Sequence, residues 1–481
     1  MFIAMVIVFV LGYVAIALEH PLRVDKAVPA LAIGSLLWVL YILGAFDIFS
    51  NGLSEAWNSF SAAGHHAGAE GHGEAGSAID QMRHFIVHNE IIQHLGDISE
   101  ILFFLLGAMT IVEITDKHDG FKVITDKIKT TKKVKLLWIL SILTFFMSAA
   151  LDNLTTTIVM VTLLRKLVSD KTTRWFFASM IILAANAGGA WSPIGDVTTI
   201  MLWIGGQVTT GAIITYVILP SLVTMIIPLI IISFSMKGDV TRPETNNDEM
   251  VLTTKNERIL MLILGVSGLL FVPVFKTITH LPPYMGMLLS LSVIWLVTEI
   301  MHRNKHQSIK SKLSVVNILK NVEMPTIFFF LGILSAVAAL QSAGHLSILA
   351  RFLDENLGNI FLIDMAIGVL SAVVDNVPLV AGAMGMYPVE NAATIAAMTD
   401  PQAIEYARFF VEDGLFWEFL AYTAGTGGSI LIIGSAAGVA AMGMEKIDFI
   451  WYLKKISWLA LIGYLAGAGT YYLQALLLGK V

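Results

Sequence analysis

The stretch Ser148-Ala-Ala-Leu-Asp-Asn-Leu-Thr-Thr-Thr157 places an aspartate and an asparagine in the middle of an apolar region. Apolar runs 136–151 and 154–164 flank the Asp152-Asn153 pair, and clusters of Lys and Arg follow at both outer ends. Lys and Arg near membrane spans concentrate on the cytoplasmic side, so both ends are expected on that side. We therefore predict a re-entrant hairpin, a structure tolerated at membrane depth only where protein or a watery cavity covers its backbone.

A second stretch, Ser371-Ala-Val-Val-Asp-Asn-Val-Pro378, repeats this pattern at an offset of 375 − 152 = 223 residues. Its apolar flanks, 361–374 and 379–386, adjoin an acidic loop rather than a basic one. The second hairpin is therefore predicted to open to the opposite side of the membrane. Two matching hairpins of opposite orientation indicate inverted repeats, the layout of many secondary transporters.

Two groups of glycines support the same repeat. Gly188-Gly189 and Gly195 match Gly427-Gly428 and Gly434 at one offset, 427 − 188 = 434 − 195 = 239. Glycine allows backbone conformations that end a helix, so each group predicts a broken helix with freed carbonyl groups. The alternative for any single glycine is close packing between membrane helices, which is the commoner use of small residues there.

The composition agrees with a membrane protein. The chain has 481 residues, of which 56% are hydrophobic and 14% charged, and its mean hydropathy is +0.76. Apolar runs of roughly 20 residues, enough to cross a bilayer as helices, recur along the chain, whereas alternating strand patterns do not. We predict an all-α polytopic membrane protein with about ten spanning helices and two re-entrant hairpins in two inverted repeats. The net charge of −6 gives no reason to expect a nucleic-acid partner, and the absence of cysteine excludes disulfides and thiolate metal sites.

Loop charges predict the following organisation. Residues 1–46 form two helices, 47–95 an extracytoplasmic His/Gly-rich loop, 96–236 the first repeat (hairpin 136–165, broken helix 174–206), 237–323 cytoplasmic loops and two linking helices, and 324–481 the second repeat (hairpin 359–387, broken helix 414–444). Both termini are predicted outside. The first apolar segment lacks a positive n-region and is expected to be a retained helix rather than a signal peptide.

The outer loop contains four residues that could suggest metal sensing: His65, His66, Glu70 and His72. Their spacing fits no defined ligand set, so a flexible solvated loop is expected instead.

Candidate ion-binding residues gather at the two turns and the two helix breaks. An ionisable residue inside a membrane is a functional hypothesis by default, because its burial is costly. The polar residues at these positions are Asp152, Asn153, Thr155, Asn186, Ser192, Asp196, Asp375, Asn376, Thr426, Ser429 and Ser435. Hard oxygen ligands of this kind suit Na⁺ or Li⁺, which we place at Asp152, Asn153, Asp196, Asp375 and Asn376. A single Ser or Thr can instead bond back to its own helix.

The surroundings of the two turn aspartates suggest a mechanism. No Lys or Arg lies between residues 138 and 164 or between 352 and 407. A carboxylate in an apolar region without a fixed cation nearby in the chain can hold either a proton or a metal cation, but gains little from both. Competition for one site gives antiport, and rocking of the repeats around that site would expose it to each face in turn.

At these residues the sequence resembles the NhaD-type sodium/proton antiporters of the ion transporter superfamily, over most of its length. The most specific stretches are 148–157, 186–199, 371–378 and 425–438. The resemblance implies the superfamily fold, Na⁺ or Li⁺ efflux in exchange for H⁺ across a bacterial cytoplasmic membrane, no cofactor, and a homodimer. Carried over by position, it implies an ion path through Asp152, Asn153, Asn186, Asp196, Asp375, Asn376, Ser429 and Ser435.

Two other functions are weighed against this one. A sodium-coupled symporter of an organic acid or oxyanion would favour neutral hairpin tips, whereas both tips here carry Asp-Asn. An intramembrane aspartyl protease could use Asp152 and Asp375 as a pair, but neither aspartate has the Gly-x-Gly-Asp setting of such enzymes. A secondary transporter, not an enzyme, is the prediction.

Overall fold

The computed structural model describes residues 1–17, 19–62, 78–243 and 252–480. His65, His66, Glu70 and His72 lie outside these residues. The described chain divides into two compact units. Unit 1 comprises Met1–Phe103, Glu323–Gly358 and Ala381–Pro388, and unit 2 comprises Phe104–Val322, Asn359–Val380 and Val389–Val481.

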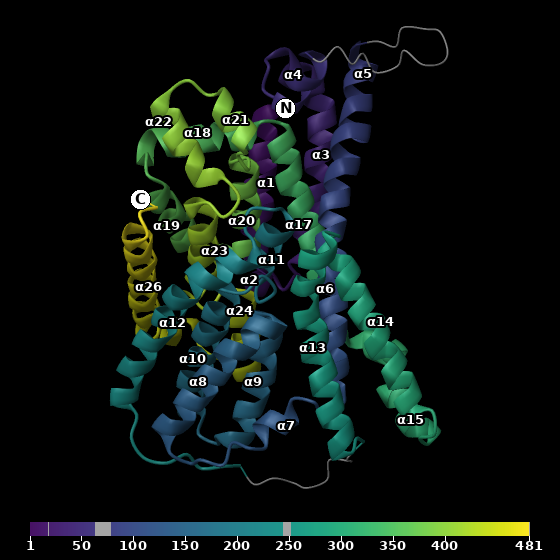
Figure 1. The fold of residues 1–481 in the computed structure, drawn as a ribbon, viewed down its shortest axis with the longest axis vertical. Helices are drawn as coiled ribbons and strands as arrows, with labels where there is room; N and C mark the ends of the chain where they lie inside the picture. Colours follow the sequence, from purple (N-terminus) through teal and green to yellow (C-terminus); the bar gives the residue numbers. More distant parts are fainter. Residues whose placement is uncertain (18, 63–77, 244–251, 481) are drawn as a thin grey trace. The chain divides into compact units, whose positions relative to one another are not determined.

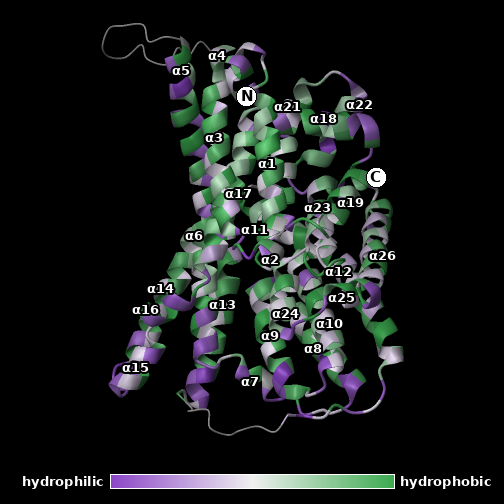
Figure 2. Ribbon diagram, turned by 180° about the vertical axis from the view of Figure 1, so that it is seen from behind, coloured by the Kyte–Doolittle hydropathy of each residue, from purple (hydrophilic) through white to green (hydrophobic). Residues whose placement is uncertain are grey.

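Helices make up both units, and the described residues contain no β-strand beyond two isolated bridges. Figure 1 shows the helices and Figure 2 their largely hydrophobic colouring. The helices of unit 1 are α1 (Phe2–Ala17), α2 (Glu19–Leu22), α3 (Ala27–Ser50), α4 (Glu55–Ala62), α5 (Ala78–Phe85), the π-helix η1 (Ile86–Ile91), the first part of α6 (Ile92–Lys117), α17 (Met324–Ser342) and α18 (His345–Leu357).

Unit 2 contains the remaining helices. They are α7 (Lys122–Thr125), α8 (Lys133–Leu151), α9 (Asn153–Leu167), α10 (Lys171–Ala190), α11 (Val197–Ile204), α12 (Thr210–Ser235), α13 (Lys255–Thr279), α14 (Pro283–His302), α15 (Gln307–Leu313), α16 (Val315–Ile318), the 3₁₀ turn η2 (Leu319–Asn321), α19 (Ile360–Leu370), α21 (Ala392–Ala397), α22 (Pro401–Ala407), η3 (Arg408–Phe410), α23 (Leu415–Gly427), α24 (Ala436–Glu445), α25 (Phe449–Lys455) and α26 (Ser457–Leu477). Helix α20 (Asn376–Met386) begins in unit 2 and ends in unit 1.

Seven of the described helices are long and apolar enough to cross a membrane, or eight if the bent pair α25–α26 is one span. This confirms the all-helical polytopic architecture. The sequence predicts about ten spans. The difference arises partly because α1, with 16 residues, and α23, with 13 residues, are too short when taken alone to cross roughly 30 Å of hydrocarbon.

Small residues bring α3 and α17 together in unit 1. The two helices lie side by side (Figure 1). A Cβ atom added to Gly34 or to Gly332 would collide with the backbone of the other helix, so only glycine permits this approach. Nearby, the indole Nε1 of Trp38 donates to the Ser335 hydroxyl at 3.0 Å. Close backbone contact and this hydrogen bond together hold the helix pair.

The two broken helices form the core of unit 2. Every residue from Phe177 to Ala190 of α10 is buried, and so is the whole of α23. A helix that is covered on all sides belongs to the interior of its protein rather than to the lipid boundary. Helix α10 contacts α8, α9, α12, α23 and α24, which places its C-terminal break in the middle of these elements.

Helices α8 and α9 meet at a single non-helical residue, Asp152, whose φ is 82° and ψ is 159°. The two helices contact each other. The N–H of Lys133, at the start of α8, donates to the Gly238 carbonyl at 3.1 Å, and the N–H of Ser169, just after α9, donates to the Thr241 carbonyl at 2.9 Å. Both outer ends therefore meet the same short segment of unit 2. Helix α8 alone also satisfies the length and composition of a full span.

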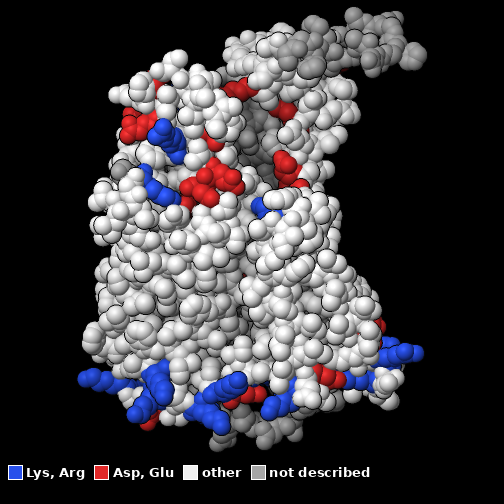
Figure 3. Space-filling model, viewed as in Figure 1, with Lys and Arg blue, Asp and Glu red and all other residues white. Residues whose placement is uncertain are grey.

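Basic side chains gather where these outer ends lie. Figure 3 shows a band of Lys and Arg along the lower edge of the view, the end at which α7, α8 and α9 are labelled in Figure 1. Residues 78–95, placed by the sequence in an outer loop, are helical from Ala78 onward, and a continuous helical segment extends over Ile79–Lys117.

Candidate ion-binding site

Unit 2 contains two helix breaks whose polar residues lie close to each other. Helix α10 stops at Ala190 and α11 begins at Val197, while α23 stops at Gly427 and α24 begins at Ala436. A Cβ atom added to Gly189 would collide with the carbonyl oxygen of Gly195, and one added to Gly428 would lie 2.7 Å from that of Gly434. Each broken segment is therefore folded tightly onto itself, and glycine is required where it turns.

Asp196 occupies the first break and is the N-cap of α11. Its side chain is 1% exposed. The Oδ1 atom accepts hydrogen bonds from the Thr198 N–H at 3.0 Å and from the Thr198 hydroxyl at 2.9 Å. The Asp196 N–H donates in turn to the Thr199 hydroxyl, which completes a capping box. Helix capping thus explains why an aspartate is suited to this position, but it satisfies only one of the two carboxylate oxygens.

Two asparagines from other elements reach the same carboxylate. The Asn153 side-chain amide donates to Asp196 Oδ2 at 2.6 Å. The Asn376 amide lies 3.4 Å from both Asp196 oxygens. Both asparagines are at least nine-tenths buried, and each directly follows one of the two turn aspartates. The carboxylate is therefore surrounded by neutral donors from both repeated Asp-Asn pairs.

A chain of hydrogen bonds continues from Asn153 into the second break. Asn153 also donates to the Asn186 Oδ1 atom at 3.1 Å. The Asn186 amide donates to the hydroxyls of Ser429 at 2.9 Å and Ser435 at 2.8 Å. Asn186 is fully buried, and both serines are almost so. The breaks of α10–α11 and α23–α24 are thus connected through side chains that lie far apart in the sequence.

The two turn aspartates lie at the edge of this network and are partly exposed. Asp152 caps α9, and its oxygens accept from the N–H and the hydroxyl of Thr155, each at 2.8 Å. Asp375 Oδ1 accepts from the Val377 N–H at 3.2 Å. Both aspartates interact electrostatically with Asp196.

Two of the predicted ligands donate to backbone carbonyl groups rather than to the side chains of this network. The Ser192 hydroxyl donates to the Ala149 carbonyl at 2.5 Å. The Thr426 hydroxyl donates to the Tyr422 carbonyl of its own helix at 2.6 Å, which is the back-bonding expected of a lone threonine in a helix. Conversely, Thr198 contacts Asp196 but is not among the predicted ligands. The sequence Asp196-Val-Thr, an N-cap residue before a threonine, is the signal that could have identified it.

No Lys or Arg forms an ion pair with Asp196 among the residues that the structure describes. Nor do those residues contain a group of three or more His, Cys, Asp or Glu side chains placed to hold a metal ion. The oxygens available at Asp196 come instead from carboxylate, amide and hydroxyl groups together. Such a mixed set of hard donors is suited to an alkali cation and offers nothing to a soft metal.

Contacts around the breaks recur at the offsets of the sequence repeat. The Ser148 hydroxyl donates to the Ala185 carbonyl at 2.6 Å, and the Ser371 hydroxyl to the Ala424 carbonyl at 3.0 Å. The donors are 371 − 148 = 223 residues apart and the acceptors 424 − 185 = 239. At the same offsets Asp196 corresponds to Ser435, since 435 − 196 = 239.

The chain is similar to one family profile and to several known proteins. A family profile described as a citrate transporter matches residues 4–405. The chain is 42% identical over 471 residues to a protein of Arabidopsis thaliana named sodium/proton antiporter 1, covering 98% of this chain and 72% of that protein. It is 43% identical over 388 residues to sodium/proton antiporter 2 of the same plant, covering 80% and 88%. It is also 27% identical over 490 residues to the Na⁺/H⁺ antiporter NhaD of Alkalimonas amylolytica, covering 96% and 89%.

Proposed function

Because this chain belongs to the NhaD-type Na⁺/H⁺ antiporters of the citrate-transporter family, we propose that it exchanges Na⁺ for H⁺ across a membrane and that the Asp196 network is its ion site. It is a multi-pass membrane protein and a secondary transporter. The relatives bear names that state the exchange of sodium and protons, and the residue-level assignment is our own.

The observation that carries the site assignment is the environment of Asp196. The carboxylate is 1% exposed and receives hydrogen bonds from neutral groups only, among the described residues. Neutral donors orient a carboxylate, but they leave its charge uncompensated in a region of low dielectric. A proton or a small cation supplies the missing charge, and the two compete because each removes the reason for binding the other.

Two asparagine amides next to Asp196 are the groups that would respond to cation binding. Asn153 and Asn376 each present an amide to Asp196, and each belongs to one of the two Asp-Asn turns. An asparagine amide can rotate to offer its oxygen to a bound cation in place of its N–H. In our proposal Na⁺ is held by Asp196 with oxygens of the two asparagines, and Asp152 and Asp375 add negative charge nearby.

We further propose that the transporter consists of two inverted repeats with two re-entrant hairpins, α8–α9 and α19–α20, in an ion-transporter-superfamily fold of about ten spans. The paired contacts at Ser148 and Ser371 support the repeat, and the shared attachment of both ends of α8–α9 supports the first hairpin. Rocking of the repeats would expose the Asp196 site to each side in turn. Li⁺ as a second substrate, a homodimer, a bacterial cytoplasmic membrane and outward-facing termini complete the proposal.

A sodium-coupled symporter of an organic acid is the second candidate, favoured by the description of the family profile as a citrate transporter. The three carboxylates at and beside the site argue against it. A carboxylate substrate would meet Asp152, Asp196 and Asp375, and like charges repel in a low-dielectric site. An anion site would instead be expected to use helix N-termini free of acidic caps.

The test is an ion-flux measurement on proteoliposomes that contain the purified protein and an internal pH dye. An inward or outward Na⁺ jump is expected to change internal pH in the direction of exchange, while citrate and succinate accumulate no more than in empty vesicles. Asp152→Asn and Asp375→Asn are expected to abolish the Na⁺-driven pH change although both variants still insert and purify. Normal exchange by both variants would exclude the two turn aspartates from the ion path, and normal exchange by Asp196→Asn would refute the site. Citrate uptake without a pH change would refute antiport.

A further inference from the structure

Another buried carboxylate, Glu90, lies in unit 1, apart from the Asp196 network. Glu90 belongs to the π-helix η1, which interrupts the helical stretch between α5 and α6. Single π-helical turns inside α-helices are rare and occur frequently at functional sites, because the extra residue shifts the direction of the following side chains. Here the shift accompanies a charged residue that is 5% exposed.

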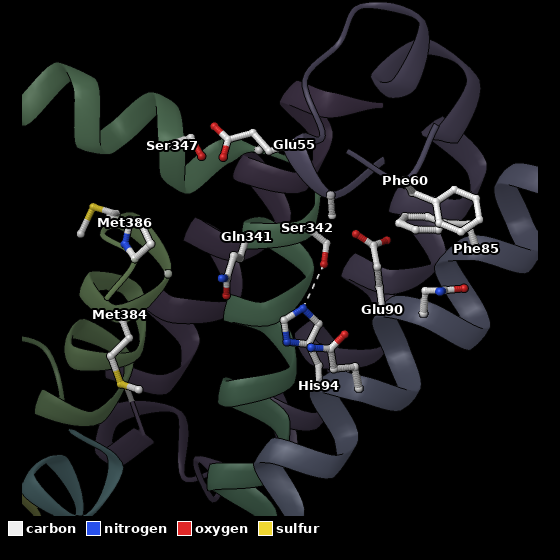
Figure 4. Close-up of a pocket in the computed structure, with 16 residues that line it drawn as sticks. Glu55, Phe60, Phe85, Glu90, His94, Gln341, Ser342, Ser347, Met384 and Met386 are labelled. Carbon is white, nitrogen blue, oxygen red and sulfur yellow. Dashed lines mark hydrogen bonds between the residues drawn. The ribbon is translucent and has the colours of Figure 1, made fainter. Parts of the chain in front are cut away.

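Glu90 lines a cavity of about 520 Å³ that is built within unit 1. The walls come from α4, α5, η1, α6, α17, the start of α18 and the segment Ala381–Pro388. Figure 4 shows the Glu90 carboxylate directed toward Ser342, with the rings of Phe60 and Phe85 on its other side. The carboxylate thus lies between an aromatic wall and a polar helix edge.

Neither oxygen of this carboxylate has a hydrogen-bond partner among the described residues. The nearest polar side chains, Tyr41 and Ser342, interact with the carboxylate, and each of them also has another partner. The Tyr41 hydroxyl donates to the Ser342 carbonyl at 3.1 Å, and the Ser342 hydroxyl lies 3.2 Å from His94 Nε2. A bare carboxylate in such a place is strongly destabilised, so a ligand that supplies positive charge has a large free-energy gain available.

No Lys or Arg that could supply this charge is among the described residues that line the cavity. The titratable residues of that lining are Glu55, which is exposed, Glu90 and His94. Its remaining polar side chains offer oxygens: the amides of Asn89, Gln93 and Gln341 and the hydroxyls of Ser342 and Ser347. One buried carboxylate with neutral oxygen donors suits a monovalent hard cation, whereas a divalent cation usually requires more than one carboxylate.

We propose that the Glu90 cavity of unit 1 is a second binding site for a monovalent hard cation, Na⁺, distinct from the exchange site at Asp196. Glu90 supplies the charge, and Ser342 and Gln341 supply neutral oxygens from α17. Cation binding replaces the missing hydrogen bonds of the carboxylate. The inference rests on the geometry of unit 1 alone, and the assignment of Asp196 enters only the expected amount of bound Na⁺ in the experiment.

The experiment measures binding of radioactive Na⁺ to the purified full-length protein in lipid nanodiscs at alkaline pH. Four proteins are compared: wild type, Glu90→Gln, Asp196→Asn and the double variant. Bound Na⁺ at saturation is expected to fall to half in each single variant and to background in the double variant. Asp97→Asn is the matched control, because Asp97 is an exposed carboxylate of α6 that does not line the cavity, and it is expected to bind like wild type.

A second measurement keeps the proposal testable if Glu90→Gln fails to fold. Carbodiimide labels buried carboxyl groups, and mass spectrometry identifies the labelled peptide. Na⁺ is expected to protect Glu90 in wild type and equally in Asp196→Asn, whereas choline is expected to give no protection.

The outcomes separate the two sites. If Glu90→Gln binds as much Na⁺ as wild type, or if Na⁺ leaves Glu90 labelling unchanged, the Glu90 site does not exist. If Asp196→Asn keeps full binding while Glu90→Gln loses it, the Glu90 site stands and the exchange site has been assigned to the wrong residue.

Discussion

Asp170 and Asp196 cap consecutive helices in nearly the same way but lie in opposite environments. Asp170 accepts from the Thr173 N–H at 2.7 Å at the start of α10, and Asp196 accepts from the Thr198 N–H at 3.0 Å at the start of α11. Asp170 is exposed, whereas Asp196 is 1% exposed and also receives the amides of Asn153 and Asn376. Capping alone therefore accounts for Asp170, while Asp196 carries a buried charge that a cap does not require. The following variants test that difference.

The largest effect is expected from Asp196→Asn. Asparagine caps helices about as well as aspartate, so the fold should be retained. Loss of the charge removes the partner of a buried cation, which costs about 3 to 5 kcal/mol, roughly 100- to 4,000-fold in Na⁺ affinity. Na⁺-driven pH change in proteoliposomes measures the loss, with the yield of monodisperse protein as the control for folding. Exchange at near wild-type rate would mean that Asp196 is only a cap.

Gly189→Ala is expected to disturb the packing that buries Asp196. A Cβ atom at residue 189 would collide with the Gly195 carbonyl and lie 3.2 Å from the Asp196 Cβ. Overpacking of this kind costs about 1 to 3 kcal/mol, seen as a lower Tm in a thermal stability assay. Gly443→Ala in α24 is the matched control, because nothing lies within 4 Å of its added Cβ. Equal Tm values for the two variants would show that the break tolerates a side chain.

A smaller effect is expected from Asn153→Ala, which leaves the charge but removes one neutral donor. The variant loses the 2.6 Å hydrogen bond to Asp196 and the 3.1 Å bond to Asn186. Apparent Na⁺ affinity should fall roughly tenfold, equivalent to about 1.4 kcal/mol, as measured by titrating the exchange rate with Na⁺. An unchanged affinity would exclude Asn153 from the cation site.

The smallest effect is expected from Asp170→Asn. Hydrogen bonds from Thr173 hold the pKa of Asp170 below its ordinary value. A depressed carboxyl pKa stabilises the folded state above the unfolded pKa, about 3.9, and this contribution is lost as pH falls through the folded pKa. The variant should exchange Na⁺ like wild type and lose a small part of the acid sensitivity of its Tm below about pH 4. Impaired exchange would show that capping by itself affects transport.

Much of the candidate site could be predicted because its residues interrupt apolar patterns. Asn153, Asn186, Asp196 and Asn376 stand at turns or beside paired glycines in membrane segments, where a polar side chain is costly to bury and therefore points to a function. The structure brings these four together with Ser429 and Ser435. Their ion-binding role stays a prediction, as do the hairpins and the orientation of the repeats.

The rest could not be predicted because it depends on three-dimensional neighbours. Thr426 and Ser192 match the site by composition, yet each finds a carbonyl within reach, a choice that sequence spacing does not reveal. The helix that begins at Ala78 follows polar and small residues, and no strong apolar periodicity in the sequence predicts it. Glu90 falls within the outer loop predicted over 47–95, where a single glutamate gives no sign of the cavity that encloses it.

The backbone conformation of Asp152 is energetically unfavourable, whereas those of its neighbours in the chain are helical. With φ at 82° and ψ at 159° it lies in a region of conformational space essentially reserved for glycine, where other residues carry a penalty of order 1 to 3 kcal/mol. Asp152→Gly would relieve that penalty and yield a more heat-resistant but transport-deficient protein. In the proposed ion path, aspartate at this position trades stability for activity, because its carboxylate is useful to transport while its main chain favours glycine.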